Sequence, residues 1–79
     1  MRAMTLYDFI QLSQKEKTGI VWEGKFLSTR RDREHTVVLY KVYDFFCEVY
    51  YERKNNSIIK LKPFRTKAML QQFFSYQLN

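Results

Sequence analysis

The chain is poor in the residues on which many catalytic and metal sites depend. Its 79 residues include one cysteine, one histidine, one proline and two glycines. A lone Cys47 excludes an intramolecular disulfide, and together with the single His35 it cannot supply a zinc site. Two glycines cannot build a glycine-rich phosphate loop. We therefore expect no cofactor and no metal, and the unpaired cysteine fits a cytoplasmic location.

The chain also lacks a long apolar run. No stretch approaches the roughly 20 apolar residues that a membrane-spanning helix needs. Met1–Met4 leads into an amphipathic segment rather than the apolar region of a signal peptide. We expect no membrane association, because no segment combines a strong apolar helical face with a lysine-rich polar face.

Basic charge and aromatic side chains are what the chain has in abundance. The net charge is +6 at pH 7, which favours an acidic partner such as nucleic acid or an acidic protein. Hydrophobic residues make up 46% of the chain and aromatic residues 18%. Large rings bury much area, so they can sustain one small packed domain over residues 1–79.

Residues 36–64 are the centre of the predicted fold. Val, Tyr, Phe and Ile are concentrated there, and such side chains suit a pleated, half-buried surface. Two polar breaks, at Tyr43-Asp44 and at residues 54–56, divide this region into three strands. A segment of loosely alternating apolar and polar residues upstream of it is predicted to form a fourth strand. A short polar connection over residues 31–35 favours antiparallel pairing in chain order. The predicted strands are Lys25–Arg30, Thr36–Val42, Phe45–Arg53 and Ser57–Phe64.

The register of the two later hairpins follows from the hydrophobic pattern. A two-residue turn at Tyr43-Asp44 pairs Val42 with Phe45 and keeps the apolar residues on one face. For the next hairpin, a two-residue loop would turn apolar residues to the wrong face. A three-residue loop, with Asn56 in the left-handed conformation, avoids this. It is expected to pair Tyr51 with Ile59, Val49 with Leu61 and Glu48 with Lys62.

This register divides the strand residues between two faces. We name the first the core face; it carries Val38, Tyr40, Val42, Phe45, Cys47, Val49, Tyr51, Ile59 and Leu61. We name the second the lysine face; it carries Val37, Leu39, Lys41, Phe46, Glu48, Tyr50, Lys60, Lys62 and Phe64. The lysine face is too aromatic for a simply solvated surface and too charged for a simple core.

Helices are predicted both before and after the strands in the sequence. Thr5 can cap a helix over Leu6–Leu12, and S-x-x-E at Ser13 begins a second over Gln14–Glu23. A hairpin over residues 19–27 is an alternative to this second helix. A third helix, Lys67–Gln77, is expected to pack on the core face. The predicted fold class is α+β: helix, helix, four-stranded antiparallel meander, helix.

Three segments carry a resemblance to a known group. Trp22–Leu27, Leu39-Tyr40 and Phe46–Tyr51 resemble the spaced pattern of small single-domain proteins from Bacteroidetes-type bacteria, over most of the chain. The pair Tyr43-Asp44 departs from the Asp-Gly turn frequent in that group, and one residue fewer separates Glu23 from Gly24. The resemblance implies a helix for the second segment, and it implies no activity.

Catalysis is not expected. His35 lies in or beside an exposed turn, whereas a general base needs a cleft and a partner. Cys47 lies on the core face, where a buried cysteine behaves as a small inert hydrophobe. The carboxylates of Asp44, Glu48 and Glu52 are too scattered for a paired acid and base.

The lysine face is the predicted binding surface. Apolar and aromatic side chains on an exposed face often mark a protein interface. We therefore predict a non-catalytic protein–protein interaction module that binds a protein partner or a second copy of itself, as a homodimer. No small-molecule ligand is indicated. The predicted contact residues are Val37, Leu39, Phe46, Tyr50, Lys60, Lys62 and Phe64.

Nucleic-acid binding is the alternative function. Rings interleaved with lysines on an open sheet can stack bases and neutralise phosphates, although Glu48 and Glu52 weaken the potential of the same face. A further alternative places the first two helices over the lysine face and makes it core. The residues predicted to bind nucleic acid are Arg30, Arg31, Arg33, Lys41, Lys60 and Lys62.

Overall fold

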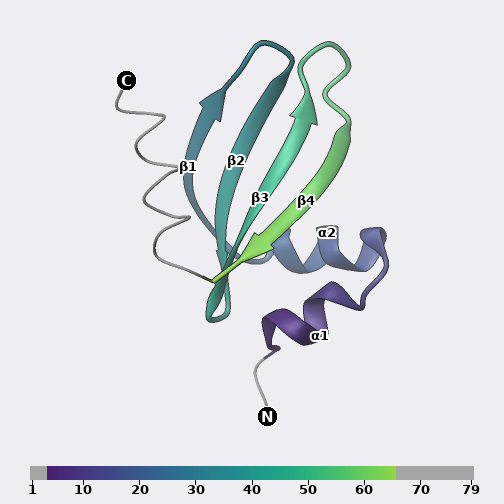
Figure 1. Cartoon of the computed structure of the whole chain (residues 1–79), viewed down its shortest axis with the longest axis vertical. Helices are drawn as coiled ribbons and strands as arrows, with labels where there is room; N and C mark the ends of the chain where they lie inside the picture. Colours follow the sequence, from purple (N-terminus) through teal and green to yellow (C-terminus); the bar gives the residue numbers. More distant parts are fainter. Residues whose placement is uncertain (1–3, 66–79) are drawn as a thin grey trace.

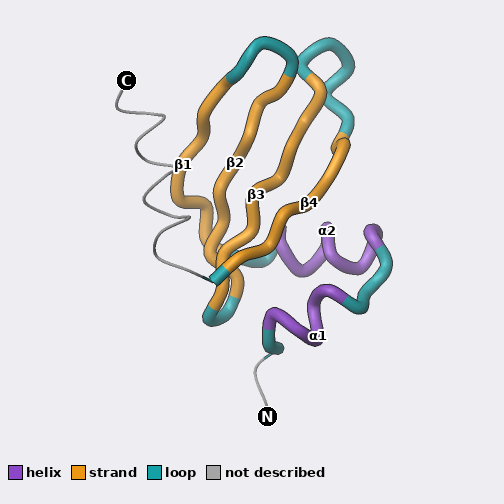
Figure 2. Tube along the Cα trace, in the orientation of Figure 1, coloured by secondary structure: helices purple, strands orange, loops and turns teal. Residues whose placement is uncertain are grey.

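The computed structural model describes residues 4–65, which form two helices followed by a four-stranded sheet (Figure 1). The sheet is antiparallel in the order β1-β2-β3-β4 (Figure 2). The α+β class and the meander are confirmed, while the predicted helix Lys67–Gln77 lies outside the described residues. The elements are α1 (Leu6–Ile10), α2 (Gln14–Trp22), β1 (Lys25–Arg31), β2 (His35–Val42), β3 (Phe45–Glu52) and β4 (Ile58–Phe64).

Capping boxes fix the start of both helices. The Thr5 hydroxyl accepts a hydrogen bond from the Asp8 amide at 3.1 Å, and the Asp8 carboxylate accepts one from the Thr5 amide. Ser13 and Glu16 make the same reciprocal pair at α2. Each box satisfies two amides that have no partner inside the helix. The helical prediction for residues 14–22 is therefore confirmed, and the hairpin alternative is wrong.

The β2–β3 hairpin has the predicted register. Val42 pairs with Phe45, Tyr40 with Cys47 and Val38 with Val49. Tyr43 has a φ of 54°, so the tight turn requires a left-handed residue at a position without glycine. Because every β2–β3 pair is as predicted, the two central strands divide their side chains between the faces as the sequence indicates.

The β3–β4 hairpin differs from the prediction at its turn. The Glu52 amide donates to the Ser57 carbonyl at 2.8 Å, and Tyr51 pairs with Ile58 rather than with Ile59. The loop is therefore one residue longer than predicted, and a bulge at Ile59 absorbs the extra residue. Ile59 is 44% exposed and is not a core residue.

Beyond the bulge the predicted β3–β4 register holds. Val49 pairs with Leu61, Glu48 with Lys62 and Tyr50 with Lys60. The left-handed conformation of Asn56 is also confirmed, with a φ of 59°. The bulge thus confines the error in the predicted register to the turn end of the hairpin.

Both helices pack on the core face. Phe9 of α1 and Val21 of α2 are buried against Phe45 and Val49, and the rings of Phe9 and Phe45 lie 5.2 Å apart. The alternative that places these helices over the lysine face is wrong, because their buried side chains join the apolar residues of the core face. Figure 1 shows both helices at the end of the sheet opposite the β1–β2 and β3–β4 turns.

We expect the two glycines to respond in opposite directions to substitution by alanine. A Cβ at Gly24 would lie 2.5 Å from the Lys41 carbonyl oxygen, whereas a Cβ at Gly19 meets nothing within 4 Å. Gly24→Ala should lower the free energy of unfolding by about 1–3 kcal/mol through overpacking. Gly19→Ala should raise it by about 0.5–1 kcal/mol through helix propensity. Urea unfolding measures both, and a Gly24→Ala protein as stable as its parent would contradict the packing described.

Candidate functional site

The strands bring the predicted contact residues together on the lysine face. Tyr50 lies between Val37 and Lys60 in neighbouring strands, and Glu48 lies between Leu39 and Lys62. Phe46 lies between Lys41 and Phe64 in the same way. The residues predicted to share this face therefore do so, on three adjacent strands.

Burial separates these residues into two groups. Val37 and Leu39 are fully buried and Phe64 is 4% exposed, and together they form a second apolar cluster. Partly buried Leu27, Phe46 and Tyr50 pack against it. Three predicted contact residues, Val37, Leu39 and Phe64, therefore present no side-chain surface to a partner and instead hold the neighbouring side chains in place.

Three lysines are the accessible part of the face. Lys41, Lys60 and Lys62 are exposed, while Phe46 and Tyr50 are half-buried beside them. The accessible surface therefore combines flexible ammonium groups with the edges of two rings that a buried cluster supports.

A buried carboxylate lies between the lysines and is already neutralised. Glu48 is 6% exposed, and its Oε2 lies 3.4 Å from Nη2 of Arg30. The same Arg30 nitrogen donates to the Tyr50 hydroxyl at 3.3 Å, and that hydroxyl donates to Glu48 Oε1. A buried charge needs such partners. Sequence reasoning counted Glu48 against the basic potential of the face, but Arg30 cancels its charge.

Burial and the adjacent Glu48 charge both act on the Tyr50 hydroxyl. Burial is the main cause of the raised pKa of the Tyr50 hydroxyl, and the Glu48 carboxylate raises this pKa further. The hydroxyl therefore keeps its proton and remains a donor to Glu48. The sequence pattern does not predict this network, because Arg30 and Glu48 lie on β1 and β3, which are not adjacent in the sheet.

The rings of the lysine face are in contact with other side chains of the chain. The Nζ of Lys60 lies 4.5 Å from the Tyr50 ring centroid, and the His35 ring meets the same ring edge-on at 6.0 Å. Phe46 stacks on Phe64 with 5.5 Å between centroids. A base could stack on Tyr50 only by displacing Lys60 from a cation–π contact.

The six residues predicted to bind nucleic acid do not form one surface. Lys41, Lys60 and Lys62 lie on the lysine face, and Arg30 is held by Glu48. Arg31 pairs with Thr36, which pairs with Tyr51, so Arg31 belongs to the core face. Arg33 lies in the β1–β2 turn.

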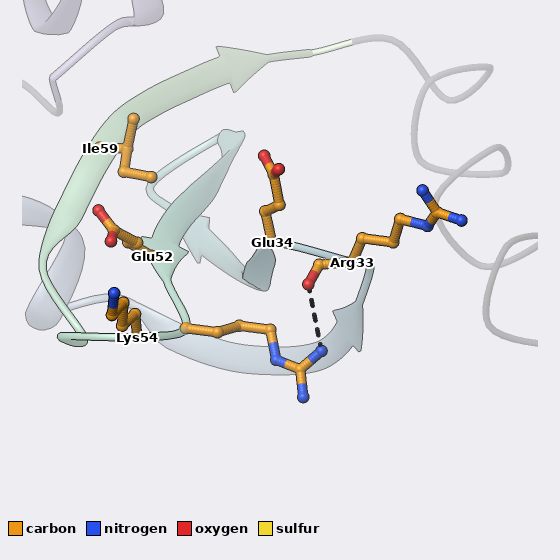
Figure 3. A pocket seen from close by; sticks show the side chains of 6 residues that line it. Arg33, Glu34, Glu52, Lys54 and Ile59 are labelled. Atoms are coloured by element: carbon orange, nitrogen blue, oxygen red, sulfur yellow. Dashed lines mark hydrogen bonds between the residues drawn. The ribbon is translucent and has the colours of Figure 1, made fainter.

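A groove of about 570 Å³ lies where the β1–β2 and β3–β4 turns meet (Figure 3). Arg53 joins the two turns, because its amide donates to the Glu34 carbonyl and its Nη1 donates to the Asp32 and Arg33 carbonyls. Both charge signs border the groove, so it favours no one ligand charge. The lining residues are Arg33, Glu34, Glu52, Arg53, Lys54 and Ile59.

Cys47 lies in the core, and His35 pairs with Asp32 at the start of β2. Cys47 is fully buried, and burial raises the pKa of its thiol to about 12. His35 begins β2, and its Nδ1 lies 3.3 Å from Asp32 Oδ1. Slight burial opposes ionisation of Asp32, but amide hydrogen bonds from His35 and Glu34 outweigh it and lower the pKa. Within residues 4–65 no three His, Cys, Asp or Glu side chains gather closely enough to hold a metal ion.

Comparison of the chain with protein-family models, curated protein sequences and solved structures found no significant match. In the described part of the chain, no helix has the length and apolar character needed to cross a membrane. A function for the chain is therefore inferred from the geometry of its described residues.

Cys47 should make stability depend on alkaline pH. Burial raises the pKa of the thiol from 9.0 to about 12, so between these values the unfolded chain loses a proton that the folded chain keeps. The free energy of unfolding then falls as pH rises through this window, by at most about 1.4 kcal/mol per pH unit from this group. This contribution is fully present below the lower value and is lost towards the upper one.

Cys47→Ala isolates the effect. Tyr40 and Tyr50 also have raised pKa values and remain in both proteins. The free energy of unfolding of parent and variant is measured with urea from about pH 8 to about pH 11. The amount by which the parent's value exceeds that of the variant should shrink as pH rises. An advantage that stays constant across this range would disprove the assignment.

Proposed function

We propose that this chain is a non-catalytic interaction module that binds an acidic protein through the lysine face. The observation that carries the proposal is the arrangement of exposed Lys41, Lys60 and Lys62 around half-buried Phe46 and Tyr50. The buried cluster beneath fixes the backbone positions of these residues, so the charges are presented in a defined pattern. Such a pattern steers an oppositely charged partner and selects its register.

The use of both rings within the chain supports a protein partner over nucleic acid on this face. Base stacking needs a free ring surface, whereas Lys60 covers Tyr50 and Phe64 covers Phe46. A protein partner needs no such surface, since carboxylates can pair with the lysines and apolar side chains can contact the ring edges.

Like charges weigh against the homodimer form of the proposal. In a two-fold dimer the same patch meets itself, so Lys41, Lys60 and Lys62 of one copy would approach those of the other. Like charges facing each other across an interface disfavour it. An acidic partner of different sequence therefore fits this face better than a second copy.

Two finer predictions belong to the proposal. The first is the helix Lys67–Gln77, which lies outside the described residues and stays a prediction. The protein works in the cytoplasm, where a free buried thiol such as Cys47 suits the reducing conditions. Trypsin mapping of the folded chain and fractionation of its host cells test these two predictions.

Selection of displayed random peptides on the folded chain tests the proposed partner chemistry. We expect selected sequences rich in Asp and Glu next to apolar residues. Their affinity should fall about tenfold or more in the Lys60→Glu/Lys62→Glu variant, because the mutation replaces attraction by repulsion.

The matched control is Arg33→Glu/Lys54→Glu, which changes the net charge equally at the turns. It should retain most of the affinity. Selected peptides without acidic enrichment, or equal losses in both variants, would refute binding at the lysine face.

A further inference from the structure

Within residues 4–65, the core face carries a second group of rings beyond the part that α1 and α2 cover. Phe26 of β1 is 56% exposed, and Tyr40 beside it on β2 is half-buried. Trp22, the last residue of α2, is 60% exposed, and only Glu23 and Gly24 separate it from β1. Tyr51 lies further along the same face on β3. We name Trp22, Phe26, Tyr40 and Tyr51 the ring strip.

These rings are less occupied than those of the lysine face. Phe26 and Tyr40 meet edge to face, at 6.2 Å and 81°, and Phe26 keeps more than half of its surface in solvent. Burial comes first in raising the pKa of the Tyr40 hydroxyl, and the nearby Tyr51 raises it further. The strip thus offers fixed rings with accessible surface.

The strands of the two faces also carry different charged side chains. The β3 carboxylates, Glu48 and Glu52, pair across the sheet with Leu39 and His35 of the lysine face. The strand residues of the core face in the described chain include no carboxylate. They do include the exposed Arg31, beside Thr36 and Tyr51.

Arg33 follows Arg31 by two residues and lies in the β1–β2 turn. Its side chain points away from Glu34, Glu52 and Ile59 (Figure 3). The row of Tyr40 and the row of Thr36 are four residues apart on β2, or about 13 Å at the usual strand rise. Stacked nucleotides rise about 3.4 Å each, so a few nucleotides fit between the rings and the guanidinium groups.

We propose that the ring strip binds single-stranded nucleic acid, with Trp22, Phe26 and Tyr40 stacking bases and Arg31 and Arg33 contacting phosphates. Stacking on exposed rings beside a positive groove is how sequence-tolerant single-strand binders work. This goes beyond the proposed function, because it assigns a different class of partner to the opposite side of the sheet. The combination of exposed ring surface with a guanidinium group, on strands that carry no carboxylate on this face, selects the occupant.

The single tryptophan gives a direct readout. Trp22 is the only tryptophan in the chain, so its fluorescence reports on the end of α2, where the strip begins. Titration of the full chain with mixed-sequence single-stranded RNA and DNA of about 12 nucleotides should quench it. The matching duplex should quench it less, and the affinity should weaken steeply with salt. If neither the single-stranded RNA nor the single-stranded DNA quenches the fluorescence at low salt, the proposal is overturned.

Variants separate the strip from general charge. Phe26→Ala should weaken binding about tenfold or more, while Tyr7→Ala, which removes a ring exposed on α1, should not. Glu23→Lys, next to Trp22, should strengthen it. Lys60→Glu/Lys62→Glu should reduce it far less than Arg31→Glu/Arg33→Glu, which makes the same charge change.

Several outcomes would overturn this proposal without touching the proposed function. Equal losses in Phe26→Ala and Tyr7→Ala would remove the strip as the site. Equal losses in the two double charge reversals would leave only unspecific attraction. An acidic peptide selected on the lysine face should bind alongside the oligonucleotide. Its displacement by the oligonucleotide would show one shared site and refute the assignment to opposite faces.

Discussion

Pairing between β2 and β3 decides what each side of the sheet presents. These two strands are central, and side chains alternate along them, so a shift by one residue would exchange the faces. The turn at Tyr43-Asp44 sets the pairing, with Val42 opposite Phe45. From this one register follow the core under the helices, the buried Val37 and Leu39, and the separation of Glu48 from Arg31.

Features that depend on neighbouring residues were predictable from the sequence. The two capping boxes, the α+β class and the β2–β3 register rest on local spacing and on the two-residue period of strands. Asn56 was predictable because few residues adopt a left-handed conformation without cost. Where the pattern was strict, the prediction and the structure agree.

Features that depend on side-chain length and distant contacts were not predictable. The bulge at Ile59 compensates for a longer loop, and either arrangement keeps Leu61 on the core face. The burial of Phe64 and the Arg30–Glu48–Tyr50 network arise from contacts across strands that alternation cannot reveal. The residues of the lysine face were identified correctly as a group, but which of them remain accessible was decided by packing.

The bulge has a consequence for the outer strand of the sheet. An edge strand offers backbone groups to which another chain can add, and natural sheets resist this with bulges, prolines and lysines. In β4 the bulge at Ile59, the lysines at positions 60 and 62 and Pro63 follow one another. A chain this rich in β-forming side chains thus carries, along one border, its own protection against edge-to-edge polymerisation.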